Sequence, residues 1–270
     1  MKLPFLTVAL CLLFVFTYAQ KTPDIQISAL IAPANIRVDG KLSEWQSFSA
    51  ENKRTELFYS LANDNKNVYL VIKSASKESL NKILAGGISF TINPENKKRE
   101  KEGATITFPL INRGNRNQGQ RQPGGQGRPQ GGGMGGFQNR GQQDAKTRDS
   151  IASVQRKAQL SAIKEIKVAG IKSIQDSLIS IYNEHGIKAV ATIDETGAFV
   201  YELALPIDLL LLKAGQEFAY QIKLNGLSNM NFGGGNAGGG RPGGNFGFAG
   251  GGPDMMSPTD FWGKYTLINK

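Results

Sequence analysis

The residues that could carry chemistry are few and lie far apart in the sequence. Trp45 and Trp262 are the two tryptophans of the chain, and an exposed indole ring can stack on the apolar face of a sugar. Trp45 and Trp262 are therefore the candidate ligand-binding residues. The interpretation that we prefer is structural for both: Trp45 packs at the edge of the core, with Asp39-Gly40 forming the tight turn before it, and Trp262 is a similar case.

The single histidine, His185, does not belong to a recognisable metal or catalytic set. It lies within Tyr182–Gly186, a stretch that predicts a hairpin turn between two strands. Neither a cysteine nor spaced carboxylates join it in a metal-binding pattern, and no Asp-x-Asp-x-Asp calcium loop is present. We therefore expect no metal site, at His185 or elsewhere, and no cofactor.

The remaining polar residues give no sign of catalysis. The sequence contains no Gly-x-Ser-x-Gly nucleophile elbow, and Glu44, Glu202 and Glu217 are expected to face solvent on strands or turns. Asp64 and Asp194 have the sequence surroundings of turn residues. We therefore predict that the protein is not an enzyme.

The N-terminus has the pattern of a secretory signal. A basic start, an apolar run from Leu3 to Phe16 and small residues up to Ala19 predict cleavage after residue 19. The alternative is a membrane anchor, but the run is shorter than the roughly 20 residues that a spanning helix needs. Leu10 before Cys11 disfavours a lipoprotein signal, and the mature chain, residues 20–270, would have no cysteine. We expect export to the periplasm, the cell surface or the medium.

Two glycine-rich tracts, 113–143 and 231–253, interrupt the rest of the chain. Their low apolar content predicts disorder. Six arginines of these tracts and Lys2 account for seven units of the net charge of +10, which leaves +3 for the folded part. Basic Gly-Arg tracts can bind RNA, but an exported protein does not meet cellular RNA, so we expect no nucleic-acid partner.

Outside the tracts, apolar and polar residues alternate with a period of two, which predicts half-buried strands. Phe90, Tyr201 and Phe218 are expected to point into one interior. Many short strands separated by turns favour an all-β, antiparallel, jelly-roll-like β-sandwich. The expected strands lie near residues 25–30, 57–61, 68–73, 88–92, 104–108, 166–171, 178–182, 187–193, 199–205, 218–224 and 265–268.

One segment follows a helical period instead. The spacing of Ile151, Val154, Ala158, Ala162 and Ile166 places them on one face of a helix over about 147–163. We expect this inserted helix to pack its apolar face on the sandwich. A second short helical piece is expected to follow Pro206, through Leu209 to Leu212.

Three stretches, in order, resemble the family 9 carbohydrate-binding module and its relatives in the DOMON-like superfamily. Residues 36–45 match the opening Val-Asp-Gly-x-Leu-x-Glu-Trp pattern, 67–73 match an early strand, and 199–206 match the Tyr-Glu strand near the C-terminal half. Residues 261–267 are compatible with the last strand. The resemblance implies a single sandwich domain over 20–270, with the two tracts as insertions, and in some relatives a bound calcium.

The sequence departs from this family where sugar is bound. In sugar-binding members the ring that precedes the strand at 88–92 would lie in 82–87, and the second ring would lie in 252–256, but neither segment has an aromatic residue. The resemblance therefore implies an exported non-catalytic module, with a glycan as the expected partner. The alternative is a structural or interaction protein of the cell envelope, whose basic tract 113–143 contacts anionic polymers.

Overall fold

The computed structural model describes residues 21–111, 145–229 and 257–268. The expected signal sequence and both glycine-rich tracts lie outside the described residues. No helix among the described residues is long and apolar enough to cross a membrane.

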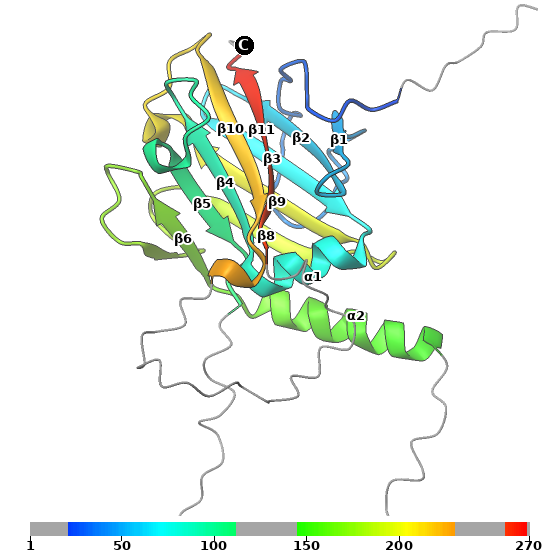
Figure 1. The fold of residues 1–270 in the computed structure, drawn as a ribbon. Coiled ribbons are helices and arrows are strands. Elements are labelled where there is room, and N and C mark those ends of the chain that lie inside the picture. Colours follow the sequence, from blue (N-terminus) through cyan, green and yellow to red (C-terminus); the bar gives the residue numbers. More distant parts are fainter. Residues whose placement is uncertain (1–20, 112–144, 230–256, 269–270) are drawn as a thin grey trace, which may run out of the picture.

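Two antiparallel sheets pack face to face as a β-sandwich (Figure 1). Sheet A contains, in spatial order, β1 (Ala50–Asn52), β2 (Leu57–Asn63), β3 (Asn67–Ser74), β9 (Phe199–Pro206) and β8 (Lys188–Ile193). Sheet B contains β11 (Thr259–Thr266), β10 (Glu217–Leu224), β4 (Ile88–Asn93), β5 (Ala104–Phe108), β6 (Glu165–Ala169) and β7 (Leu178–Ser180). The predicted all-β class is confirmed.

The core lies between the two sheets and is built from the alternating apolar positions. Phe90, Tyr201 and Phe218 are each at most 1% exposed, as predicted. Each strand sends every second side chain inward, so residues distant in sequence meet in one interior layer. The large cluster also contains Leu57, Ile106 and many further aliphatic side chains.

The first expected strand, 25–30, is wrong: these residues form no strand. The Gln26 side chain lies along the edge of β2 instead, where its Oε1 accepts the N–H of Leu61 at 2.7 Å and its Nε2 donates to the Leu61 carbonyl at 2.7 Å. An amide side chain carries the same donor and acceptor as a peptide group. Gln26 therefore satisfies the peptide groups at Leu61 through its side chain, and the backbone meets the edge of β2 only at Asn63, in an isolated parallel bridge with Ile31.

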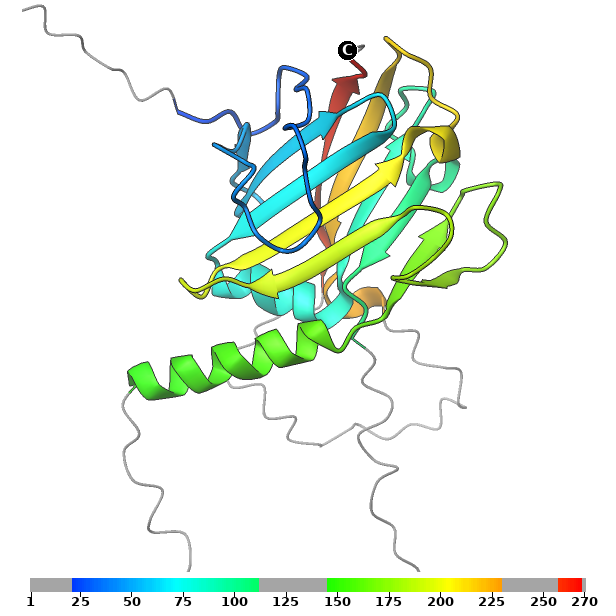
Figure 2. The same cartoon turned by 180° about the vertical axis from the view of Figure 1, so that it is seen from behind.

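In the part of the chain that the structure describes, two α-helices and three short 3₁₀ helices accompany the sheets. They are α1 (Lys77–Gly86), α2 (Ala145–Ser161), η1 (Glu100–Glu102), η2 (Ile207–Leu210) and η3 (Gly226–Asn229). Helix α1 links sheet A to sheet B at one end of the sandwich, and α2 lies beyond it (Figures 1 and 2). The predicted inserted helix corresponds to α2, and η2 overlaps the second predicted helical piece, whereas α1 was not predicted.

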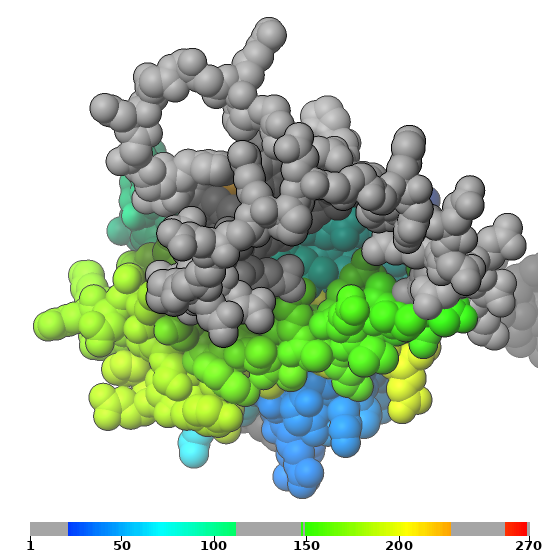
Figure 3. All heavy atoms as spheres, turned by 90° about the horizontal axis from the view of Figure 1, so that it is seen from below, coloured from blue at the N-terminus to red at the C-terminus, as the bar shows by residue number. Residues whose placement is uncertain are grey.

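The predicted inner face of α2 is wrong. Ile151 and Val154 are 44% and 67% exposed, and the helix buries Leu160 against the sandwich instead. Ile166 is buried, but it belongs to β6. The C-terminal part of α2 packs against the sandwich, where the helix contacts β8. The first turns of α2 extend past the edge of the sandwich, so no core covers them (Figure 2). Viewed from below, α2 lies at the surface of the molecule (Figure 3).

Candidate functional site

A buried carboxylate, Glu202, gathers three residues of the opening motif on the outer face of sheet A. Glu202 is 2% exposed. Its Oε2 accepts the backbone N–H groups of Asp39 and Gly40 at 2.9 and 2.7 Å, and its Oε1 accepts the indole N–H of Trp45 at 3.3 Å. The Val-Asp-Gly-x-Leu-x-Glu-Trp and Tyr-Glu stretches thus meet at one side chain.

The backbone conformation at Gly40 makes this approach possible. Gly40 has a φ of +83°, which glycine adopts without a steric penalty. A Cβ at this position would also lie 3.0 Å from Cγ2 of Thr192 and 3.2 Å from Cγ1 of Val190. The turn therefore packs closely against β8, while the backbone N–H groups of Asp39 and Gly40 point at Glu202.

The expectation that Glu202 faces solvent is wrong. The N-terminal segment, residues 21–49, covers this face of sheet A, as Figure 2 shows. Four of its side chains pack on a small cluster around Tyr69 and Ala204: Leu30, Ile36, Val38 and Trp45. Burial raises the pKa of Glu202 above its ordinary value, against the lowering effect of the three hydrogen bonds. The arrangement acts as a structural clamp for the segment.

Trp45 and Trp262 do not come together. Trp45 lies over the outer face of sheet A, half-buried. Trp262 lies on β11 opposite Gln221 and alternates with the buried Phe261 and Tyr265, which places its side chain on the outer face of sheet B. The sandwich separates the two rings, so they cannot clamp one sugar between them. A ligand-binding role for either ring alone stays a prediction.

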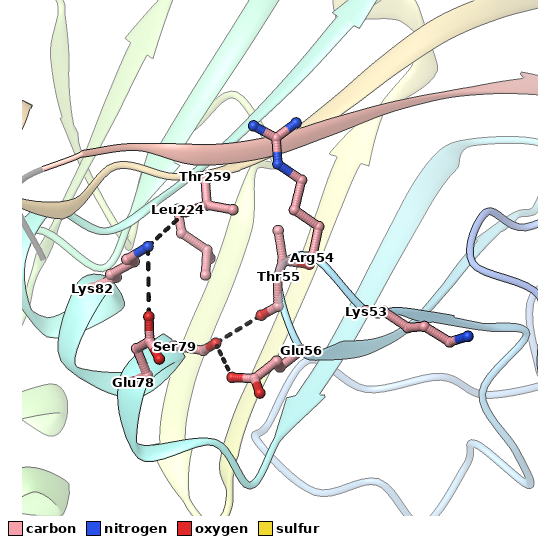
Figure 4. Close-up of a pocket in the computed structure, with 9 residues that line it drawn as sticks. All are labelled: Lys53, Arg54, Thr55, Glu56, Glu78, Ser79, Lys82, Leu224 and Thr259. Carbon is pink, nitrogen blue, oxygen red and sulfur yellow. Dashed lines mark hydrogen bonds and ion pairs between the residues drawn. The ribbon is translucent and has the colours of Figure 1, made fainter. Parts of the chain in front are cut away.

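A polar pocket of about 210 Å³ lies at the end of the sandwich that carries α1. We call it the α1 pocket. Four parts of the chain line it: the β1–β2 connection, α1, the end of β10 and the start of β11 (Figure 4). Its lining residues are Lys53, Arg54, Thr55, Glu56, Glu78, Ser79, Lys82, Leu224 and Thr259.

Lys82 is the most enclosed charge of the α1 pocket. Its side chain is 10% exposed, and its Nζ donates to Oγ1 of Thr259 at 2.7 Å and lies 4.0 Å from the carboxylate of Glu78. Figure 4 shows both contacts, with Lys82 and Glu78 projecting from adjacent turns of α1. A buried ammonium is costly unless its donors are satisfied, so this position favours an additional acceptor.

The other side of the pocket depends on the start of α1. Ser76 caps the helix by accepting the N–H of Ser79 at 3.2 Å, and its own hydroxyl hydrogen-bonds to the carboxylate of Glu56. Ser79 donates to the Thr55 carbonyl at 2.7 Å. These contacts fix the β1–β2 connection against the helix, so both walls of the pocket hold their positions.

Sequence reasoning missed Lys82 as a site residue because it missed α1. The signal was present: a capping serine at position 76 precedes Leu80, Ile83 and Leu84, which have helical spacing. The segment 82–87, where the family resemblance places an aromatic ring, has none. The structure shows that its lysine, rather than a ring, faces the pocket.

The other sequence candidates lie apart from the α1 pocket. Asp64 and Asp194 are in turns, as expected, and their carboxylates accept nearby backbone N–H groups. Glu217 is exposed and contacts Lys264. The loop with His185 is not a hairpin, because β7 joins sheet B and β8 joins sheet A.

Within the described residues, no three His, Cys, Asp or Glu side chains lie close enough together to hold a metal ion.

No protein-family model matches this chain, and a search of the curated proteins gives no significant match.

Proposed function

We propose that this chain is an exported, non-catalytic β-sandwich module that binds carbohydrate in the α1 pocket. The observation that carries the proposal is the lining of the pocket. Hydroxyl, carboxylate and ammonium groups converge there from three parts of the chain, the β1–β2 connection, α1 and the start of β11, and each can donate to or accept from a sugar hydroxyl. The pocket is preformed, as ligand sites usually are.

The position of the pocket supports the same conclusion. It lies between α1, which contains most of the segment 82–87, and Thr259, which follows the segment 252–256. In the family 9 carbohydrate-binding modules that the sequence resembles, these two segments carry the sugar-stacking rings. Polar recognition at this place would replace ring stacking.

The contacts of Ser79 favour binding over catalysis. A nucleophilic serine needs a base that takes its proton. The Ser79 hydroxyl donates to the Thr55 carbonyl at 2.7 Å, and the nearest Glu56 oxygen is 3.5 Å away. A carbonyl oxygen cannot act as that base.

Retention of the folded protein on immobilised polysaccharides and on a glycan array tests the proposal. Thr259→Trp should fill the pocket and abolish retention, whereas Thr266→Trp, at the far end of the same strand, should leave it unchanged. Both positions are on β11, but Thr266 is exposed and pairs with Glu217 rather than with Leu224. The proposal is wrong if the folded wild type is not retained by any polysaccharide, or if Thr259→Trp binds as well as the wild type.

Export has its own test. N-terminal sequencing of protein recovered from outside the cytoplasm should give Gln20 as the first residue. A chain that still begins at Met1 would contradict cleavage after Ala19.

A second candidate is an envelope interaction protein whose basic tract contacts anionic polymers. Pairing places Phe108, Ile88, Leu224 and Thr259 in one row across sheet B. The chain therefore leaves toward 112–144 and 230–256 from the same end of the sandwich. Deleting 113–143, which contains five arginines, should abolish salt-sensitive association with an anionic polysaccharide; unchanged association would exclude this candidate.

A further inference from the structure

The charge distribution in the α1 pocket goes beyond general sugar binding. Three cationic residues, Lys53, Arg54 and Lys82, line the pocket against two carboxylates, Glu56 and Glu78. The cations and the carboxylates differ in how many of their hydrogen-bond positions are already used. This difference indicates which kind of ligand fits the pocket.

Lys82 has donor capacity to spare. An ammonium group has three N–H donors, and among the described residues Nζ of Lys82 has a single hydrogen-bond acceptor, Oγ1 of Thr259. The carboxylate of Glu78 is 4.0 Å away and 58% exposed, so water screens that attraction. An anionic oxygen in the pocket would supply the missing acceptor at the most enclosed cation.

The two carboxylates are suited to accept hydroxyl groups. Glu56 receives the hydroxyl of Ser76, and Ser79 lies at 3.5 Å from it. Glu78 is largely open to solvent. Each carboxylate has several lone-pair positions, so both can accept further O–H donors while Lys82 binds an anion. A ligand that satisfies both sides must carry hydroxyls and a negative charge together.

We propose that the α1 pocket selects acidic sugars, with the carboxylate of a uronic acid residue bound by Lys82 and supported by Arg54. The sugar hydroxyls then donate to Glu56 and Glu78. This inference depends on the proposed carbohydrate-binding function and narrows its ligand class.

A matched pair of probes isolates the charge. D-glucuronate and D-glucose differ at C6, where one has a carboxylate and the other a hydroxymethyl group, and oligogalacturonate and a neutral oligosaccharide of equal length form a second pair. Titration calorimetry on the full mature chain should show the acidic probe of each pair binding at least tenfold more tightly. Raising the salt concentration should weaken the binding of the acidic probe and leave the binding of the neutral probe unchanged.

Lys82→Met should lower the affinity for the acidic probes at least tenfold and the affinity for the neutral probes much less, because a neutral sugar loses one hydrogen-bond donor whereas an acidic sugar also loses its counter-charge. Lys82→Arg retains the charge and should keep part of the preference. Lys53→Met is the control, because it removes the same charge from an exposed side chain that points away from the other lining residues (Figure 4). Thermal unfolding of each variant establishes that it is folded before binding is compared.

The outcomes separate the inference from the function on which it rests. If acidic and neutral probes bind equally, or if Lys53→Met and Lys82→Met have the same effect, the acidic preference is wrong while the binding module stands. If no probe of either kind binds the folded wild type, and the glycan array is also empty, both are overturned. If Lys82→Met does not fold, the affinities of Lys82→Arg and the salt dependence of the wild type still decide whether the pocket prefers acidic sugars.

Discussion

The hydroxyl groups of Tyr59 and Tyr220 meet 2.9 Å apart inside the core, one from each sheet. Both side chains are fully buried, and their rings lie edge to face with centroids 6.3 Å apart. The Tyr59 hydroxyl also accepts the backbone N–H of Gln26 at 2.9 Å. Tyr59 therefore joins three parts of the fold: sheet A, sheet B and the N-terminal segment.

This arrangement predicts unequal costs for removing the two hydroxyls. Tyr59→Phe leaves both the Gln26 N–H and the Tyr220 hydroxyl without a partner, whereas Tyr220→Phe leaves the Tyr59 hydroxyl still bonded to Gln26. Because an unsatisfied buried polar group costs about 1–3 kcal/mol, we expect Tyr59→Phe to lower the free energy of unfolding by about 2–3 kcal/mol and Tyr220→Phe by about 1 kcal/mol. Urea unfolding of both variants measures this; a larger loss for Tyr220→Phe would contradict it.

The alternation of apolar residues was enough to predict the class of fold and the inward side chains, because strand period and burial are local properties. It could not predict strand order, which depends on pairing between distant residues such as Leu224 and Thr259. It also mistook 25–30 for a strand. The apolar pattern there is real, but at Leu61 the edge of β2 is bonded by the side chain of Gln26 rather than by the backbone of a strand.

The candidate site was harder to predict for the same reason. Glu202 has the sequence surroundings of an exposed strand residue, and its burial comes from Asp39, Gly40 and Trp45, more than 150 residues earlier. Lys82 becomes a pocket residue because Thr259 reaches it from a distant strand. Both contacts join residues more than 150 positions apart, so no local sequence pattern can predict them.

Glu202 should make stability depend on pH in a direction set by its raised pKa. A carboxyl whose pKa is higher in the folded state binds its proton more tightly when folded, so the free energy of unfolding falls as pH rises from the ordinary value of 4.5 through the raised value. Glu202→Gln removes this titration while keeping an acceptor for the amide N–H groups of Asp39 and Gly40.

The wild type should therefore gain stability relative to Glu202→Gln as pH falls through that window. Chemical unfolding at closely spaced pH values measures the difference. Glu202→Ala is the companion variant: it leaves three N–H donors without an acceptor and should cost about 2–3 kcal/mol at neutral pH. A difference between wild type and Glu202→Gln that stays constant with pH would contradict the raised pKa.

Gly263 should not tolerate even one methyl group. A Cβ at this position would lie 2.3 Å from Cζ and 2.4 Å from the hydroxyl oxygen of Tyr220. The ring is enclosed in the core and cannot move aside as an exposed side chain could. We expect Gly263→Ala to cost at least about 2 kcal/mol, in the range of overpacked cores.

Gly197→Ser provides a contrast to Gly263→Ala, because Gly197 has open space around its Cβ position but a φ of +84°. Its cost should come from backbone strain alone and remain near 1 kcal/mol. Thermal unfolding of both variants makes the comparison, and a Gly263→Ala variant as stable as the wild type would show that Tyr220 has room to shift.

The two faces of α2 should respond differently to the same kind of truncation. Leu160 is 2% exposed and belongs to the core cluster, whereas Val154, less than two turns earlier, is 67% exposed. Leu160→Ala should cost about 2–4 kcal/mol, because it opens a cavity between the helix and the sandwich. Val154→Ala removes no buried contact and replaces a β-branched residue by the best helix former, so it should change the free energy of unfolding by less than about 0.5 kcal/mol. Urea unfolding of the two variants separates the faces: a costly Val154→Ala with a neutral Leu160→Ala would mean that the helix presents its Ile151 and Val154 side to the body after all.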